Sequence, residues 1–296
     1  MATARAEGWT VRRTLQLVAV AALLAVRVAG ATAPEPRTAV LLLGDSNFRH
    51  LLDDAAAARG SGCTHASPAA LPRLGRGNRS EVRVRPGGKA RRALACHDGR
   101  REYEFVHHYG VSSAPPYCSE VKCNVEKPNN PYSWGTPPPS SVELMAGATA
   151  TFAASRRNDT AAGDLCKVAV VLSGAWDASR WFHVVGDEMR VAGAAGETMT
   201  AVFMHAHEQN LTAALAAVVE AAEEAEARGA KEQPALDGVL IWLPHELYAN
   251  AMGGLNHLAR MSAAHVAHTL AVAGGLRTAG GRRVPVGVLD PHETIG

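Results

Sequence analysis

The sequence predicts an α/β fold, namely a three-layer, doubly wound parallel sheet with irregular loop insertions. Two observations support this. Short and almost wholly apolar runs occur at residues 38–43, 166–172 and 238–243, and such runs are typical of strands buried on both faces of a parallel sheet. Helical patterns separate the runs, and a glycine or proline follows each run closely, so strands and helices alternate along the chain.

The first run enters Gly44-Asp45-Ser46 and then a predicted helix at residues 48–57. Residues 102–110 alternate polar and apolar side chains and end in Gly110, which predicts the second strand. The run at 166–174 has the same pattern as the first, because it is almost wholly apolar and leads into a glycine turn, Gly174-Ala175-Trp176-Asp177. These turns would all lie at the carboxyl ends of strands.

A long Ala/Glu-rich pattern at residues 197–228 predicts a helix, interrupted near Asn210 and closed by Gly229. The strand at 238–244 follows, and His245 stands directly after it. The last elements are a helix at 255–272, ended by Gly274-Gly275, and a strand at 284–290. Ligands of such sheets bind outside the carboxyl ends of the strands, so these ends are where we expect the site.

A single domain at residues 38–296 accounts for the chain length. Two stretches within it, 59–98 and 112–141, are rich in Gly, Pro, Arg or Ser and lack a sustained period, so both are predicted as irregular loop insertions. The basic stretch at 73–101 is interpreted as a solvated loop, or as a surface that meets an acidic glycan.

The first 31 residues have the features of a signal peptide. Arg12 and Arg13 precede an apolar run at 15–26, and Ala29-Gly30-Ala31 offers a cleavage site. An uncleaved signal anchor, and with it a membrane attachment at the N-terminus, is the alternative. Either way the sequence predicts the secretory pathway: a secreted protein, or one in the lumen of the ER or Golgi.

Sequons and cysteines agree with that compartment. The sequons begin at Asn78, Asn158 and Asn210. The cysteine count is five, so four can pair and one stays free in an oxidising lumen. Cys118 and Cys123 form a candidate short-range pair, although the full connectivity does not follow from the sequence.

Several function classes are disfavoured by composition and spacing. The formal net charge is only +2, which does not indicate nucleic-acid binding. The pairs His205/His207 and His265/His268 lack the partners of a metal site, and His245-Glu246 is not followed by a second histidine, because residue 249 is alanine. No metal or organic cofactor is predicted, and the oligomeric state stays open.

Ser46 is the candidate nucleophile. A serine near the first turn of a helix meets free backbone N–H groups and the positive end of the helix dipole, which favour the negative charge formed when a serine attacks a carbonyl. The alternative is that Asp45 or Ser46 merely caps the helix, as Asp and Ser commonly do.

Gly44-Asp45-Ser46-x-x-Arg49, followed by His50 and Leu51, resembles the SGNH (GDSL-like) hydrolases, and most of all their PC-esterase branch with the trichome-birefringence-like proteins. The resemblance implies that Ser46 is the nucleophile of an esterase or O-acyltransferase acting on acyl, typically acetyl, esters of carbohydrate. It also implies three oxyanion donors: the Ser46 N–H, a glycine after the second strand, and an asparagine in a Gly-x-Asn-Asp block.

Gly110 is the candidate for the family's glycine, with Gly135 as the competitor. Gly174 and Asp177 match the later block, but Trp176 stands where asparagine is expected. An indole N–H can donate a hydrogen bond from a different position, while the structural alternative is that Trp176 covers the edge of the sheet.

The family's Asp-x-x-His, which supplies the base and its orienting carboxylate, is not matched. Asp290-Pro291-His292 is one residue too short. The sequence therefore predicts either a chain truncated before that block or one that has lost the base; His292 is the nearest candidate within the sequence. A non-catalytic glycan-binding or structural luminal protein on the same fold is the alternative function.

Overall fold

The structure is a computed structural model. It describes residues 37–58, 62–66, 91–96, 101–108, 110–111, 141–155, 165–173, 177, 196–227, 235–244 and 253–290. Its elements, in chain order, are β1 (Arg37–Gly44), α2 (Ser46–Ala57), β2 (Cys63–Ala66), β3 (Arg91–Cys96), β4 (Arg101–His107), α3 (Ser141–Ser155), β5 (Leu165–Leu172), α6 (Gly196–Ala227), β6 (Gly238–Trp242), α7 (Gly253–Val272), β7 (Leu276–Arg277), β8 (Arg283–Val284) and β9 (Val286–Leu289).

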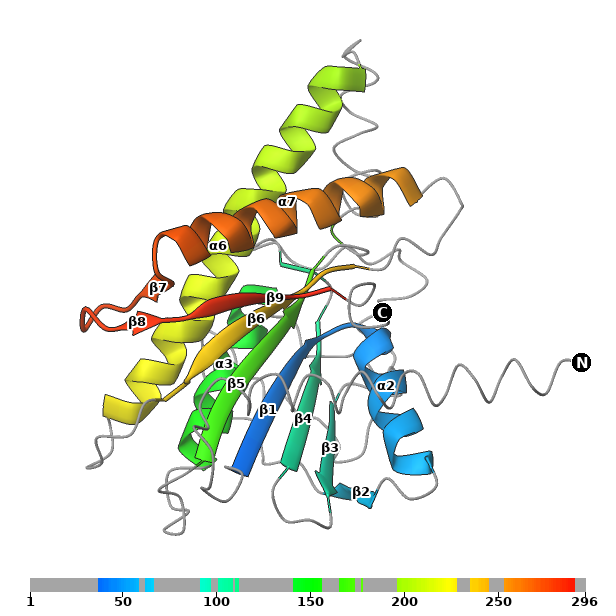
Figure 1. Ribbon diagram of the computed structural model, residues 1–296, viewed down its shortest axis with the longest axis vertical. Helices are drawn as coiled ribbons and strands as arrows, with labels where there is room; N and C mark the ends of the chain where they lie inside the picture. Colours follow the sequence, from blue (N-terminus) through cyan, green and yellow to red (C-terminus); the bar gives the residue numbers. More distant parts are fainter. Residues whose placement is uncertain are drawn as a thin grey trace, which may run out of the picture.

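A seven-stranded sheet forms the centre of the described residues, in the order β2-β3-β4-β1-β5-β6-β9 (Figure 1). The five strands from β4 to β9 are parallel, as the sequence predicts. β2 and β3 are antiparallel additions at one edge, so the sheet is mostly rather than wholly parallel. The prediction that the strand around Val168–Leu172 lies beside the first strand is confirmed, with Leu43 opposite Val171.

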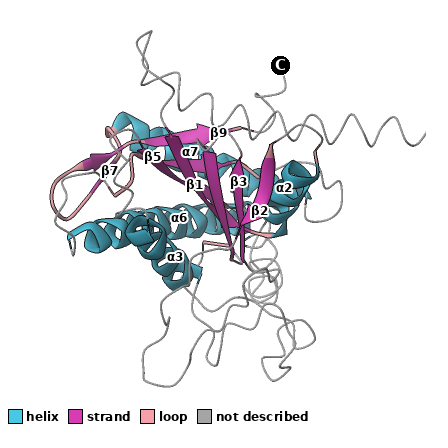
Figure 2. Ribbon diagram, turned by 90° about the horizontal axis from the view of Figure 1, so that it is seen from below, coloured by secondary structure: helices cyan, strands magenta, loops and turns pink. Residues whose placement is uncertain are grey.

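Helices cover both faces of β1. Its alternate residues Ala39, Leu41 and Leu43 belong to the core that includes side chains of α3, α6 and α7. Val40 and Leu42 face the other way, into the core formed with α2. Figure 2 shows α3 and α6 together on one side of the strands, away from α2. A strand covered on both faces consists almost entirely of apolar residues, which explains the first run.

Three segments differ from the sequence-based expectation. Residues 63–66 and 91–96 are strands, so the prediction of irregular loop was wrong there. Helix α3 was not predicted, although its buried residues Leu144, Met145, Ala148 and Phe152 recur at helical spacing. Helix α6 runs through Asn210 without the predicted interruption.

The last predicted strand is divided at Pro285 into β8 and β9. Proline has no N–H to donate to a sheet, so it marks the boundary between them. The predicted glycine end of α7 is confirmed, because Gly274 and Gly275 have φ values of 79° and 100°, and the Gly275 N–H donates to the Leu270 carbonyl at 2.8 Å. This is a common way to satisfy the last carbonyls of a helix.

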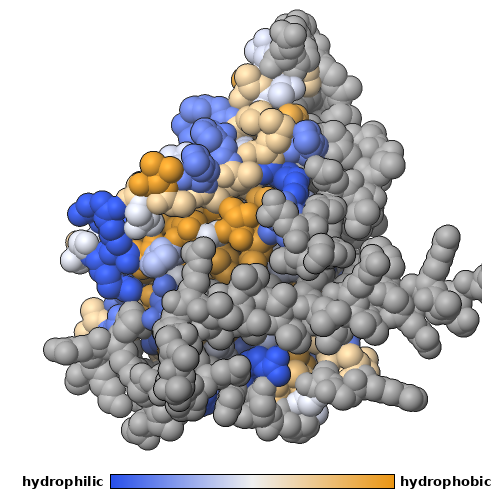
Figure 3. All heavy atoms as spheres, in the orientation of Figure 1, coloured by the Kyte–Doolittle hydropathy of each residue, from blue (hydrophilic) through white to orange (hydrophobic). Residues whose placement is uncertain are grey.

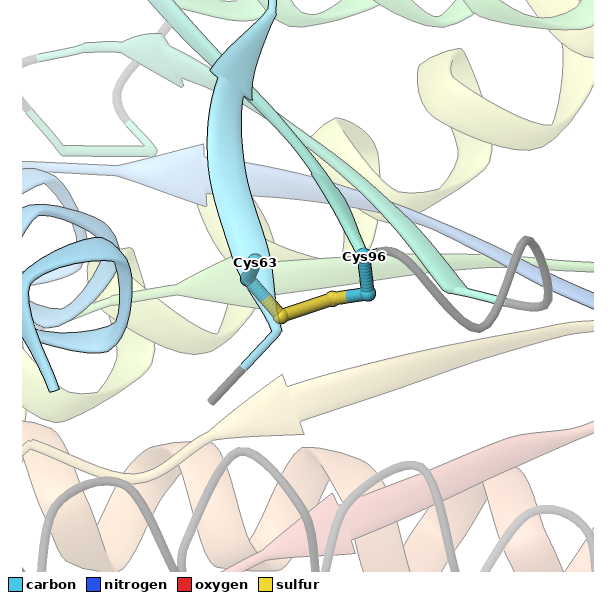
Figure 4. Close-up of a disulfide and its surroundings, with 2 residues drawn as sticks. All are labelled: Cys63 and Cys96. Carbon is cyan, nitrogen blue, oxygen red and sulfur yellow. A yellow bond between two sulfur atoms is a disulfide. The ribbon is translucent and has the colours of Figure 1, made fainter. Parts of the chain in front are cut away.

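A disulfide joins the two antiparallel edge strands. Cys63 of β2 and Cys96 of β3 are opposite each other in register and are bonded through their sulfurs (Figure 4). Cys166 is a free, half-buried thiol whose pKa burial raises to about 11. The candidate pair Cys118–Cys123 lies outside the described residues.

Within the described part of the chain, no helix combines the length and the apolar character needed to cross a bilayer. The apolar run at 15–26 lies outside that part. Apolar surface is nevertheless exposed: Val288 of edge strand β9 is 42% exposed and Val272 at the end of α7 is 76% exposed. Figure 3 shows apolar residues gathered near the middle of one face, beside the polar residues at its left margin.

Candidate functional site

The turn after β1 places Ser46 as the first residue of helix α2. Gly44, the last residue of β1, leaves no room for a side chain, because an added Cβ would lie 2.7 Å from the Phe48 ring and 2.9 Å from Leu172 Cβ. The close approach of β1, α2 and β5 therefore requires glycine here. Ser46 consequently begins the helix at the carboxyl end of a central parallel strand, as predicted.

Asp45 is the N-cap of α2. One oxygen of its carboxyl group, Oδ1, accepts the Asn47 backbone N–H at 2.8 Å, and Oδ2 accepts the Asn47 side-chain amide at 3.3 Å. The capping interpretation is thus confirmed for Asp45. Burial raises the pKa of Asp45, against the opposing effects of the Asn47 hydrogen bonds and of the charges on Arg49 and His50.

Two buried histidines lie at the end of β4: His107 is its last residue and His108 follows it. The His108 backbone N–H donates to the Gly44 carbonyl at 2.8 Å, which ties the chain after β4 to the turn before Ser46. The His107 ring meets the edge of Phe105, with ring centroids 6.3 Å apart. Burial, the charge of His108 and the charge of Arg49 lower the pKa of His107 to about 3, so the His107 ring is neutral at physiological pH.

Gly110 and Asp177 are brought together. Gly110 has a φ of 101°, and a Cβ on it would lie 2.4 Å from Asp177 Oδ1. The same Oδ1 accepts the Val111 backbone N–H at 2.9 Å. The sequence predicts that both residues follow the carboxyl ends of strands, and the hydrogen bond shows that the chain after β4 is held by Asp177 from the segment after β5, across the end of β1.

His108 contacts both backbone groups of Gly110. Its Nδ1 atom lies 3.1 Å from the Gly110 nitrogen and 2.8 Å from the Gly110 oxygen. The first contact has the geometry of a hydrogen bond donated by the Gly110 N–H. The N–H groups of Gly110 and Val111 are therefore both engaged within the protein, by His108 and Asp177 respectively.

A buried histidine on α6 connects Asp177 to α7. His207 Nε2 lies 2.7 Å from Ser173 Oγ and 3.8 Å from Asp177 Oδ2, and its Nδ1 lies 2.5 Å from Ser262 Oγ. The Ser262 hydroxyl donates its proton to the Ala259 carbonyl. Ser262 Oγ therefore accepts a hydrogen bond from Nδ1–H of His207. Nε2 of the same neutral ring carries no proton and accepts from the Ser173 hydroxyl.

Burial lowers the pKa of His207, against the opposing charges of Asp177 and Glu208, so this ring is neutral as well. His205 and His207 lie two residues apart on α6 and therefore face different sides: His205 is exposed and His207 is 3% exposed. The sequence does not predict the link of His207 to Ser173 and Ser262, because that link depends on how α6 and α7 pack.

The remaining candidates of the sequence analysis lie outside the described residues: these are Gly135, Gly174, Trp176, His245 and His292. Asp290 forms an ion pair with Arg260 of α7, and Arg260 also donates to the Pro244 carbonyl at 3.3 Å. This joins the ends of β6 and β9 to that helix.

The exposed His265 of α7 has an acidic neighbour that the sequence spacing does not indicate, because Glu208 of α6 lies 2.9 Å from its Nδ1. No group of three or more His, Cys, Asp or Glu side chains is placed to hold a metal ion among the residues that the structure describes.

The signal for the two histidines at the end of β4 is present in the sequence. His107 and His108 lie in the last part of the predicted strand at 102–110, three residues or fewer before the candidate Gly110, and polar residues at such ends line ligand sites. Comparison of the chain with protein-family models, with curated proteins and with solved structures finds no match.

Proposed function

We propose that this protein is an SGNH-type serine esterase or O-acyltransferase of the secretory pathway, acting on acyl esters, chiefly acetyl esters, of carbohydrate. The observation that carries the proposal is the place of Ser46, the first residue of α2 at the carboxyl end of β1. The unpaired N–H groups of a helix's first turn and its dipole stabilise negative charge near that residue.

The strand order supports this position. Along the chain, β1 is followed by β4 on one side of it and then by β5 on the other side. Connections that leave neighbouring strands in opposite directions open a crevice at their carboxyl ends, where α/β proteins of this type bind ligands. The crevice expected here lies between the ends of β1 and β5, which carry Ser46 and Asp177.

The implied chemistry is acyl transfer through Ser46. Its Oγ would attack the ester carbonyl carbon and lose its proton to a base, and the carbon–oxygen bond to the sugar would then break as the leaving oxygen takes up a proton. Water or a second hydroxyl would release the acyl group from Ser46. The Ser46 and Gly110 N–H groups and the 174–177 segment are the proposed oxyanion stabilisers, and His292 is the nearest candidate base.

The compartment is proposed on two features. The basic and apolar pattern of the first 31 residues has the order of a signal peptide. The Cys63–Cys96 disulfide supports an oxidising environment, since stable disulfides are rare in the cytosol.

The first test is hydrolysis of an activated acetyl ester, 4-nitrophenyl acetate, by the secreted protein. The Ser46→Ala variant is compared with Ser155→Ala, which removes an exposed hydroxyl on α3. Binding and oxyanion donors alone leave a rate about a thousandfold above water when a triad member is removed, so we expect the wild type to exceed that residual rate. Ser46→Ala should fall to the residual rate and Ser155→Ala should keep the wild-type rate; a wild-type rate above the residual level that is unchanged in Ser46→Ala would exclude Ser46 as the nucleophile.

A non-catalytic glycan-binding or structural luminal protein is the second candidate. It is favoured by one observation: the Gly110 and Val111 N–H groups already have acceptors in His108 and Asp177. An oxyanion hole needs donors directed at the reacting oxygen. Binding of acetylated polysaccharide that is equally tight in wild type and Ser46→Ala, with no ester cleavage by either, would support this alternative.

A further inference from the structure

The single nitrogen Nδ1 of His108 faces two groups that make opposite demands. The Gly110 N–H, 3.1 Å away, needs an acceptor, whereas the Gly110 carbonyl, 2.8 Å away, needs a donor. In a neutral imidazole each nitrogen is either a donor or an acceptor. His108 can therefore satisfy only one of these groups at a time, and its tautomer decides which.

The Gly110 hydrogen bond selects one tautomer in the free protein. Because the Gly110 N–H is directed at Nδ1, Nδ1 is bare and accepts it, and the proton of the neutral ring is on Nε2. His108 is 1% exposed, and Nε2 has no hydrogen-bond partner among the described residues, so this tautomer leaves a buried N–H without an acceptor.

The surroundings keep the ring neutral. Burial lowers the pKa of His108 overall, against the Leu43 and Gly110 backbone groups and the charge of Asp177. A change in the ring is therefore a change of tautomer, in which Nε2 loses a proton and Nδ1 gains one without a change in charge. In the second tautomer Nδ1–H donates to the Gly110 carbonyl, and the Gly110 N–H is released.

Asp177 fixes the rest of the loop. Its Oδ1 holds the Val111 N–H at 2.9 Å and packs against the Gly110 Cα. The loop after β4 is thus anchored beyond Gly110 by Asp177 and before it by the bond from His108 N–H to Gly44. Between these anchors, the Gly110 N–H is the donor that the His108 ring can take up or release.

We propose that His108 is a positioning residue whose tautomer determines whether the Gly110 N–H is held inside the protein or offered to an oxygen of a bound ligand. When a ligand oxygen takes this N–H, a bare Nδ1 would face the Gly110 carbonyl with two lone pairs opposed. Transfer of the ring proton to Nδ1 removes that repulsion and replaces it with a hydrogen bond. The identity of the ligand oxygen, that of an acyl ester, rests on the proposed function.

The test uses nuclear magnetic resonance of the secreted protein with ¹⁵N-labelled histidine and glycine. In the free protein we expect the proton of His108 on Nε2 and a Gly110 amide that is protected from hydrogen exchange. Acetate, added as the oxygen ligand, should shift the Gly110 amide and move the ring proton toward Nδ1, while the exposed His205 ring keeps its tautomer. A free protein with the proton on Nδ1 and an unprotected Gly110 amide would overturn the proposal.

Two further results would also overturn it. One is a Gly110 amide that shifts with acetate while the His108 tautomer does not change. The other is an acetate titration that alters neither group at any concentration that leaves the protein folded. Because neither measurement needs turnover, a failure to hydrolyse esters would refute the proposed function and leave this inference standing.

A matched pair of variants tests the role of Nδ1 without an assignment of the ring tautomer. His108→Asn places an amide oxygen or nitrogen close to the position of Nδ1, whereas His108→Gln places its amide near that of Nε2. Exchange of the Gly110 amide should be about fivefold faster in His108→Gln, the factor expected for one lost hydrogen bond, and near wild type in His108→Asn. Equal exchange in both folded variants would show that Nδ1 is not the acceptor.

Discussion

Two glycines at the site are required for different reasons. Gly44 is needed because Phe48 and Leu172 already fill the space of a Cβ. Gly110 is needed twice over, because its φ is 101° and because its missing Cβ makes room for the Asp177 carboxyl group. At both positions an added methyl group would displace the elements that carry the candidate site.

Gly110→Ala should therefore destabilise the protein and release the loop after β4. Adopting a positive φ costs a non-glycine residue about 1–3 kcal/mol, and the Cβ would also force Asp177 away from Val111. Urea unfolding measures the first effect, and exchange of the Val111 amide measures the second. Gly281→Ala is the matched control, since its φ is 83° but no atom lies within 4 Å of its added Cβ. A loss no larger than that of the control would contradict the role given to Asp177.

The buried serines around His207 should matter for stability. Ser262→Ala leaves Nδ1–H without its acceptor, and Ser173→Ala leaves Nε2 without its donor. An unsatisfied buried polar group costs about 1–3 kcal/mol, so each variant should lower the free energy of unfolding by about that amount. Ser155→Ala, at the exposed last residue of α3, should change it by less than about 0.5 kcal/mol. Equal effects in all three variants would show that the His207 network contributes nothing.

At the scale of elements, the apolar runs made β1, β5 and β6 predictable because a strand covered on both faces has few polar positions. β2 and β3 were not predictable in this way. They lie at the sheet edge, where few residues are buried, and 33 residues separate their cysteines. Their pairing depends on a covalent link whose partners the sequence leaves open.

In the candidate site, too, some residues could be predicted from the sequence and others could not. Ser46, Gly110 and Asp177 follow strands, so parallel topology alone predicts that they share an edge. His207 and Ser262 lie in the middle of helices and reach the site only through the packing of α6 and α7. No local pattern marks such residues, because their spacing equals that of ordinary core positions.

The edge hairpin should depend on its disulfide. Closing a loop of this length removes chain entropy from the unfolded state worth about 3–4 kcal/mol in the loop-entropy model. Reduction, or the double change Cys63→Ser and Cys96→Ser, should lower the free energy of unfolding by up to that amount. Cys166→Ser is the control, because Cys166 is free and its loss should leave the effect of reduction unchanged. Unfolding curves that coincide with and without reductant would contradict the assignment of Cys63–Cys96.

At the scale of the whole molecule, three neutral histidines are buried among the residues that the structure describes: His107, His108 and His207. The folded state lowers the pKa of each ring below the ordinary value of 6.5, chiefly through burial. The unfolded state therefore binds protons first as the pH falls below 6.5. Each ring contributes stability that is fully present above pH 6.5 and is lost as the pH falls toward the lower, folded pKa.

Two carboxyl groups, the buried one of Asp45 and the half-buried one of Asp237, act in the opposite direction. Burial raises the pKa values of Asp45 and Asp237 above 3.8. The folded state thus binds their protons more readily, and their ionisation costs stability as the pH rises through that range. Acidification relieves this cost only as the pH falls to the raised pKa values of the two carboxyl groups. The loss of stability from the histidines begins earlier, as the pH falls below 6.5.

We therefore expect the free energy of unfolding to fall between neutral pH and about pH 5, with a slope of up to about 1.4 kcal/mol per pH unit for each buried histidine. Urea unfolding at a series of pH values measures the slope. His107→Gln removes one titrating ring from the folded core and should reduce the slope by up to about a third. His205→Gln changes an exposed ring and should leave the slope as it is. A slope that is unchanged in His107→Gln would mean that His107 takes up its proton equally in both states, and that the buried, neutral ring described at the end of β4 is not the one present in solution.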